Sequence, residues 1–158
     1  MNCCLESDAP LVELQKEGQQ LACLSCNGTS RPVTLRTMLL MLKPEHFDLV
    51  GEYQYRFCAS PDCPVIYFSR EHSFMIGDVR IRVGLKEKDG PIPLCYCFGF
   101  FEQDLRREIE AKGNTTIPQR IMALTKERMC ACEERNPSGG CCLREVAKAV
   151  KRLMQEAV

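Results

Sequence analysis

The chain has 158 residues, and its 21 Lys and Arg balance its 21 Asp and Glu, so the formal net charge is zero. Without a net field it is not expected to bind nucleic acid or an anionic membrane surface, and the absence of Trp argues against base stacking. No run approaches the ~18 apolar residues of a membrane span. Residues 1–20 lack the features of a secretory signal, so we expect a cytoplasmic protein with reduced thiols.

Residues 21–90 are predicted to combine short strands with one helix, after a polar tail at residues 1–20 that is predicted to be flexible. Pro32 and Thr34 indicate the start of the helix, and Pro44 indicates its end. Its apolar face would hold Leu35, Met38, Leu39 and Leu42. The alternation of polar and apolar residues predicts strands over 52–57, 65–68 and 79–85.

Residues 86–93 are charged and rich in Gly and Pro, which predicts a boundary near residue 90. From there to residue 158 the apolar spacing becomes helical. Gly113 is expected to end a first helix, and Pro118 to lie in the first turn of a second. The apolar stripes of the expected helices are Phe101, Leu105 and Ile109, then Ile117, Ile121 and Leu124, and finally Leu143, Val146, Ala147, Val150 and Leu153.

Twelve cysteines fall in closely spaced pairs, which favours metal binding because two thiolates from one turn can reach a single ion. In a short secreted chain the same even number would indicate a disulfide framework. The lack of a visible secretory signal favours metal or redox chemistry instead. The pairs are Cys3 and Cys4, Cys23 and Cys26, Cys58 and Cys63, Cys95 and Cys97, Cys130 and Cys132, and Cys141 and Cys142.

A CxxC pair and a CxxxxC pair in the first half predict a structural zinc site, because four thiolates at ~2.3 Å suit a tetrahedral ion. Gly28 would supply the backbone freedom of the first knuckle. The alternative is that the four thiols are buried as small hydrophobic groups. His46 and His72 are the only imidazole donors, and a solvated or capping role explains His46 at a helix end. The predicted zinc ligands are Cys23, Cys26, Cys58 and Cys63.

The second half carries its own thiols. Cys95 and Cys97 lie at a turn before a helix, and more cysteines follow in a distant loop, so the two segments could hold a rhombic two-iron cluster from both sides. Glycines and backbone amides around them would donate hydrogen bonds to the sulfurs and raise the reduction potential.

Several motifs resemble the N-terminal domain of the copper chaperone CopZ family, over residues 21–158. The helical half is also similar to the bacterioferritin-associated ferredoxin module, which shares the CxC start. The motifs are Cys95-Tyr-Cys97-Phe-Gly99, Cys130-Ala-Cys132-Glu133, Asn136-Pro137-Ser138-Gly139, Cys141-Cys142-Leu143, the segment from Phe57 to Ser69, and Arg82-Val83-Gly84-Leu85-Lys86-Glu87-Lys88.

The resemblance implies one zinc and one [2Fe-2S] cluster, with Cys95 and Cys97 as cluster ligands. We expect Cys132 and Cys142 to complete the set, since both adjoin the Asn136 turn and Cys142 would lie at a helix start. Cys130 and Cys141 are the alternatives. The expected fold is therefore α+β, with a small zinc-ribbon-like strand and helix module over 21–90 and a three-helix [2Fe-2S] module over 91–158.

The function that follows is a metal-binding electron-transfer and metallochaperone accessory protein. In the family it resembles, the implied use is reduction of Cu(II) to Cu(I), with a copper-handling or metal-transport protein and an electron donor as partners. No nucleophile–base spacing is visible, so at most a metal-ion reductase activity is expected. The alternatives are a soft-metal or redox sensor or adaptor, and a zinc-only interaction module whose other cysteines are regulatory thiols.

Full-length members of that family continue into a domain with a Met-x-Cys-x-x-Cys copper loop, which this sequence does not show. Direct copper transfer by that loop is therefore not expected. Cys3 and Cys4 are adjacent thiols that could bind Cu(I) or Hg(II) transiently. The alternative is that they are exposed thiols open to oxidation.

Overall fold

The computed structural model describes residues 21–158, so the predicted flexible tail and Cys3 and Cys4 lie outside the described residues. Within that range, no helix is long and apolar enough to cross a membrane. The elements are β1 (Ser30–Val33), α1 (Leu35–Met41), the 3-10 helix η1 (Pro44–Leu49), β2 (Tyr55–Cys58), β3 (Val65–Phe68), β4 (Ser73–Met75), η2 (Ile76–Asp78), η3 (Gly84–Lys86), β5 (Pro93–Cys95), β6 (Phe100–Phe101), α2 (Glu102–Lys112), α3 (Ile117–Lys126), α4 (Cys132–Arg135) and α5 (Leu143–Glu156).

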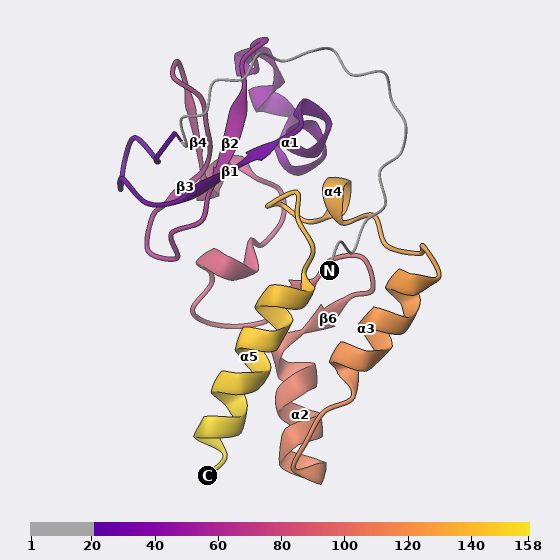
Figure 1. Ribbon diagram of the computed structural model, residues 1–158. Helices are drawn as coiled ribbons and strands as arrows, with labels where there is room; N and C mark the ends of the chain where they lie inside the picture. Colours follow the sequence, from indigo (N-terminus) through magenta and orange to yellow (C-terminus); the bar gives the residue numbers. More distant parts are fainter. Residues whose placement is uncertain (1–20) are drawn as a thin grey trace.

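The first half is built on a four-stranded antiparallel sheet in the order β1-β2-β3-β4. The central strand β3 is buried along its whole length, because its four residues are all apolar or aromatic and neighbours cover both faces. Phe57 and Tyr67 face each other across β2 and β3 with ring centroids 6.1 Å apart. Figure 1 shows α1 packed beside this sheet, which closes the first core.

The helix α1 begins later than predicted. Pro32 belongs to β1, which was not predicted, and Thr34 is the N-cap whose Oγ1 accepts a 3.1 Å hydrogen bond from the Thr37 amide. Met38 is fully buried, whereas Leu35 and Leu39 are exposed, so the predicted apolar face was only partly right. The helix ends before Pro44 as expected, and that proline then opens η1.

The strand predicted over residues 79–85 is not formed. Val79 makes only an isolated bridge with Leu42, and Gly84 begins the short helix η3. The alternation has another cause, since Val79, Ile81, Val83 and Leu85 pack against the first core. These apolar residues are buried by side-chain packing, and among residues 21–158 no strand forms a ladder with them.

The second half is mainly helical. The ribbon of β5 and β6, which was not predicted, leads into α2, and Gly113 ends that helix in the left-handed conformation (φ 76°), as expected. Helix α3 carries a proline in its first turn, also as expected. In Figure 1, α5 lies beside α2 and α3 in the lower part of the molecule, and the three helices enclose the second core. The one-turn helix α4 is an addition to the three that were predicted.

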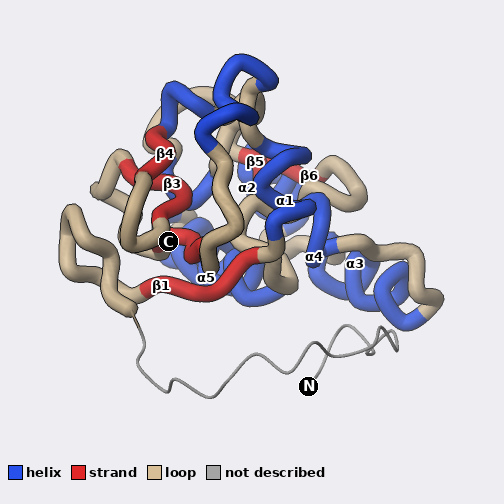
Figure 2. Tube along the Cα trace, turned by 90° about the horizontal axis from the view of Figure 1, so that it is seen from above, coloured by secondary structure: helices blue, strands red, loops and turns tan. Residues whose placement is uncertain are grey.

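The two halves are joined at α4 and the turn that follows it. Figures 1 and 2 both place α4 next to α1. Thr37 on α1 donates a 2.5 Å hydrogen bond to the carbonyl of Glu133, and Arg36 forms a 3.0 Å ion pair with Glu134. The α4 turn of the helical half is therefore positioned by the sheet half.

Candidate metal centres

The first cysteine knuckle spans Cys23 to Gly28. The Cys23 amide donates to the carbonyl of Gly28 at 3.0 Å, and the Asn27 amide donates to the carbonyl of Cys23 at 2.7 Å, so the turn closes on itself. Asn27, and not Gly28, takes the left-handed conformation (φ 57°). Gly28 is needed for space, because a Cβ there would lie 2.0 Å from Ser60 Oγ.

The second knuckle joins β2 to β3. Cys58 is the last residue of β2, and the turn that follows is held by a 3.3 Å hydrogen bond from the Cys63 amide to the carbonyl of Ser60. A small core packs behind the two knuckles and contains Cys23, Cys58, Cys63, Val65 and Phe68. The sheet therefore places the thiols of Cys58 and Cys63 next to those of Cys23 and Cys26.

The four thiols of the knuckles converge on one point. Cys23 Sγ lies 3.9 Å from Cys63 Sγ, and Cys26 Sγ lies 3.7 Å from Cys58 Sγ. A tetrahedral ion with Zn–S bonds of ~2.3 Å separates its sulfurs by about 3.8 Å. Among residues 21–158, these four thiols are the only group of three or more candidate ligands whose ligand atoms all lie within 4.8 Å of one another. The donor set and its spacing fit a closed structural zinc site.

Burial divides the four thiols. It raises the pKa of Cys23 to about 12 and also raises the pKa of Cys63. Cys26 is the one exposed thiol, and its pKa is lowered to about 6 because the Ser60 hydroxyl, at 3.2 Å, and the Gly28 amide donate to the thiolate. Cys26 is thus charged at neutral pH without a metal, and a bound cation would favour deprotonation of Cys23 and Cys63.

Neither histidine takes part in this group. His46 Nε2 lies 3.3 Å from Asp78 Oδ1, and the His72 ring packs against Phe74 with centroids 4.6 Å apart. Both imidazoles have local structural partners outside the four-thiol group.

The second group of thiols begins at the turn between β5 and β6. Cys95 ends β5, and the Gly99 amide donates to the Cys95 carbonyl at 2.9 Å to close the turn. Gly99 takes the left-handed conformation (φ 70°), which the chain needs to return as β6. The backbone amides of Cys97 and Phe98 point to the Cys95 sulfur.

The opposite side of this group is formed by α4 and the start of α5. Cys132 is the first residue of α4, and Cys142 is the N-cap of α5. Buried Asn136 fixes the turn between them, since its Nδ2 donates to the Gly140 carbonyl at 2.8 Å and its Oδ1 accepts from the Ser138 amide at 3.0 Å. Cys97 Sγ and Cys132 Sγ are 3.7 Å apart, and Cys142 lies close enough to Cys95 and Cys132 for these two thiols to raise its pKa.

This second arrangement is wider than the first. No three of its thiols have sulfurs that all lie within 4.8 Å of one another, as the four zinc thiols do. A two-iron cluster needs such a spread, with two thiolates on each iron. Cys95, Cys132 and Cys142 are buried in the second core, and the Ala131 amide donates to Cys97 Sγ at 3.2 Å. Amide donors to sulfur in a buried site are suited to a cluster, so the residues present fit one.

Interactions among the thiols of the second group shift their pKa values. Donation from Cys142 and Cys97 lowers the pKa of Cys132 well below its usual range, and donation from Cys142 lowers the pKa of Cys95 to about 7. The donors Cys142 and Cys97 have raised pKa values for the same reason. The negative charge thus rests on Cys132 and Cys95, one from each side of the group.

Two further cysteines lie beside this group. Cys130 lies close to Cys132, and Cys141 directly precedes Cys142; both are half-buried. The structure therefore brings Cys95, Cys97, Cys132 and Cys142 together and places Cys130 next to them.

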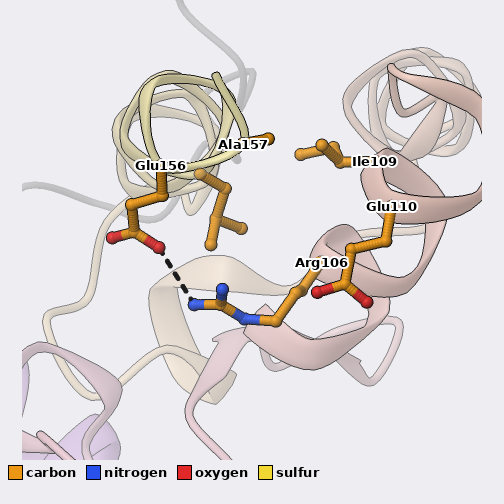
Figure 3. A pocket seen from close by; sticks show the side chains of 6 residues that line it. Arg106, Ile109, Glu110, Glu156 and Ala157 are labelled. Atoms are coloured by element: carbon orange, nitrogen blue, oxygen red, sulfur yellow. Dashed lines mark hydrogen bonds and ion pairs between the residues drawn. The ribbon is translucent and has the colours of Figure 1, made fainter.

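A hollow at the far end of the helical half is shown in Figure 3. It has a volume of about 100 Å³, and an ion pair between Arg106 and Glu156, 3.2 Å apart, crosses it. That is room for about three water molecules, whereas organic ligands need roughly 300 Å³ or more. Its lining holds no cysteine or histidine, so it is separate from both thiol groups.

Residues 20–80 match the family model of the CopZ-type zinc binding domain. The chain is 35% identical over 88 residues to the copper chaperone CopZ of Archaeoglobus fulgidus. This chain is homologous to the CopZ N-terminal domain. The X-ray structure of that domain from A. fulgidus superposes with a TM-score of 0.69 and 27% sequence identity, covering 81% of this chain and 96% of the domain.

The predicted resemblance to the CopZ family is therefore confirmed, and the four-cysteine site lies inside the matched zinc binding domain. The sequence match spans 56% of this chain but only 42% of the A. fulgidus CopZ protein. The structural match extends further, because 81% of the chain must include much of the helical half as well as the sheet.

Proposed function

We propose that the chain is a metal-handling accessory protein, in which zinc holds the first module and a redox-active [2Fe-2S] cluster is held by the second group of thiols. The observation that carries this proposal is the convergence of Cys95, Cys97, Cys132 and Cys142, with the sulfurs of Cys97 and Cys132 3.7 Å apart. Zinc has no redox chemistry of its own. When bound, a [2Fe-2S] cluster supplies one-electron transfer.

The residues around these thiols suit electron transfer. The Ala131 amide points to the Cys97 sulfur, and the amides of Cys97 and Phe98 point to the Cys95 sulfur. These donors stabilise negative charge on sulfur and so favour the reduced state. Burial of Cys95, Cys132 and Cys142 keeps water away from one side of the group.

Copper is the metal that we propose the protein handles, because the A. fulgidus relative is a copper chaperone. Cu(II) would accept one electron and leave as Cu(I), the form that thiolate ligands select. An electron donor would restore the reduced protein, and a copper-handling or metal-transport protein would receive Cu(I). We propose a cytoplasmic setting, where thiols remain reduced.

The test is anaerobic mixing of dithionite-reduced, desalted protein with Cu(II) in the presence of a chromogenic Cu(I) chelator. We expect about one Cu(I) per chain, formed as the visible spectrum returns to that of the oxidised protein. Cys132→Ala is the matched control and should form much less Cu(I). A coloured protein that leaves Cu(II) unreduced would favour a redox or soft-metal sensor, and a colourless protein would favour a zinc-only interaction module.

A further inference from the structure

Residues 82–88, here called the linker segment, connect the two thiol groups. The segment contains η3, which is closed by a 2.8 Å hydrogen bond from the Lys86 amide to the Val83 carbonyl. Val83 is only 4% exposed and belongs to the first core, so the segment is anchored to that core near its N-terminal end. Its two ends contact the chain next to each candidate metal centre.

At one end of the linker segment, Lys86 contacts the second zinc knuckle. Its side chain is 8% exposed, and its Nζ donates a 2.5 Å hydrogen bond to the carbonyl of Ser60 and lies 5.7 Å from the centroid of the Phe57 ring. The same carbonyl accepts from the Cys63 amide, and the Ser60 hydroxyl contacts the sulfur of Cys26. Lys86 therefore reaches both zinc knuckles through one residue.

The buried ammonium has an electrostatic role here. Burying a charge is costly unless it is compensated. Four thiolates around Zn²⁺ leave a net charge of about −2, which favours a cation buried nearby. Lys86 fits this role, whereas Lys88 forms an exposed ion pair with Asp62 on the same knuckle. Exposed ion pairs of this kind contribute little to stability.

At the other end, the linker segment holds Tyr96, the residue between Cys95 and Cys97. The Gly84 amide donates a 2.8 Å hydrogen bond to the Tyr96 hydroxyl, and that hydroxyl donates to the Arg82 carbonyl at 3.2 Å. Gly84 also lies against the chain just before the turn, since a Cβ there would be 1.9 Å from the carbonyl oxygen of Pro93. The position of Gly84 therefore constrains the CxC turn.

We propose that the linker segment acts as a brace, by which we mean that it couples the two turns mechanically. The geometry of the CxC turn then depends on the contact of Lys86 with the second zinc knuckle, and Lys86 and Tyr96 are positioning residues. Gly84 and Lys86 lie in the same short turn, so a displacement at one contact moves the other. The consequence for the iron centre rests on the proposed function, whereas the coupling of the two turns does not.

Hydrogen exchange of the zinc-loaded protein tests the coupling directly. Lys86→Met keeps an unbranched apolar side chain near Phe57 and removes the charge, and Lys88→Met is the matched control. Lys86→Met should speed amide exchange about tenfold in residues 58–63 and also in residues 94–100, as expected for loss of a hydrogen bond to a charged group. Faster exchange in residues 58–63 alone would overturn the brace.

Tyr96→Phe tests whether a change at the CxC turn affects the zinc site, because it removes one hydroxyl that contacts neither zinc knuckle. It should speed zinc release to a chromogenic chelator several-fold, and Lys86→Met should shift the visible circular dichroism of the iron centre. Unchanged zinc release in Tyr96→Phe would contradict the brace. A wild-type protein without visible absorption would contradict the proposed function, and the exchange and zinc-release results would still decide the brace.

Discussion

The hydroxyl of Tyr67, in the middle of the four-stranded sheet, donates a 2.6 Å hydrogen bond to the carbonyl of Pro137 in the turn between Cys132 and Cys142. Both residues are buried. Burial raises the pKa of Tyr67 far above its usual value, so the hydroxyl remains a donor at any pH at which the protein is folded. The sheet half thereby fixes the turn that presents two of the predicted cluster ligands.

Tyr67→Phe should lower the free energy of unfolding by about 1–3 kcal/mol, because it leaves the buried Pro137 carbonyl without this donor. It should also hasten the loss of the visible chromophore, since the turn loses a support. Urea unfolding and the decay of absorbance measure the two effects. Tyr53→Phe is the control, because that ring is half exposed. Equal stability of the two variants would show that the bond contributes nothing.

Cys23→Ser and Cys63→Ser should remove zinc and destabilise the sheet half by several kcal/mol, because the binding free energy of a structural zinc is folding free energy. The strand at Tyr55–Cys58 should then become accessible to proteolysis. Cys95→Ser is the control and should retain zinc. Native stability of Cys63→Ser in the presence of a chelator would mean that zinc does not hold this fold.

Alanine substitutions should divide the four later cysteines into two classes. Cys132→Ala and Cys142→Ala should bleach the protein, because their sulfurs converge with those of Cys95 and Cys97. Cys130→Ala and Cys141→Ala should keep most of the visible absorption. Iron content and absorbance measure the difference, and equal loss in all four variants would indicate that ligands exchange.

Glu108 braces the start of α3 from α2. Its Oε2 accepts from the Thr115 hydroxyl at 2.7 Å and from the Thr116 amide at 3.0 Å, and these donors lower the pKa of the carboxyl. A lowered folded-state pKa contributes stability that is present above the unfolded pKa of ~4.3 and is lost as pH falls through the folded value.

Glu108→Gln should therefore cost about 1 kcal/mol at pH 7, and the difference should shrink as the pH falls below about 4. Exposed Glu110→Gln on the same helix is the control. Comparing urea midpoints of the two variants at each pH cancels any acid-induced loss of zinc, which affects both alike. A Glu108→Gln deficit that persists unchanged at low pH would show that the charge is not responsible.

Cys3 and Cys4 lie outside the described residues, and their role stays a prediction from the sequence. If these adjacent thiols carry soft metal, one Cu(I) or Hg(II) ion should bind without displacing zinc or iron. Deleting residues 1–9 should abolish that binding and leave the visible spectrum unchanged. An unchanged stoichiometry after the deletion would exclude the tail as a transport site.

The parts of the fold that could be predicted from the sequence depend on local signals. Residues of α2, α3 and α5 repeat apolar positions at helical spacing, and Gly113 and Pro118 mark helix ends by their own backbone preferences. The grouping of the zinc thiols could also be predicted, because each pair lies within one turn and only four thiols occur between residue 21 and the boundary near residue 90.

The parts that were missed depend on tertiary contacts. Alternation over residues 79–85 resembled a strand, but which backbone lies alongside is not encoded in that segment. The ribbon of β5 and β6 is only a few residues long. The contact of Lys86 with Ser60 and the hydrogen bond of Tyr67 to Pro137 join residues distant in the sequence, and no spacing rule predicts them.

The most direct test of the central claim is metal analysis of anaerobically purified protein combined with electron paramagnetic resonance after dithionite reduction. The account predicts about one zinc and about two iron atoms per chain. It also predicts a rhombic spin-½ signal that appears on reduction and is absent from Cys132→Ala. One zinc without iron, and no signal on reduction, would contradict a redox-active second centre and leave only the zinc module.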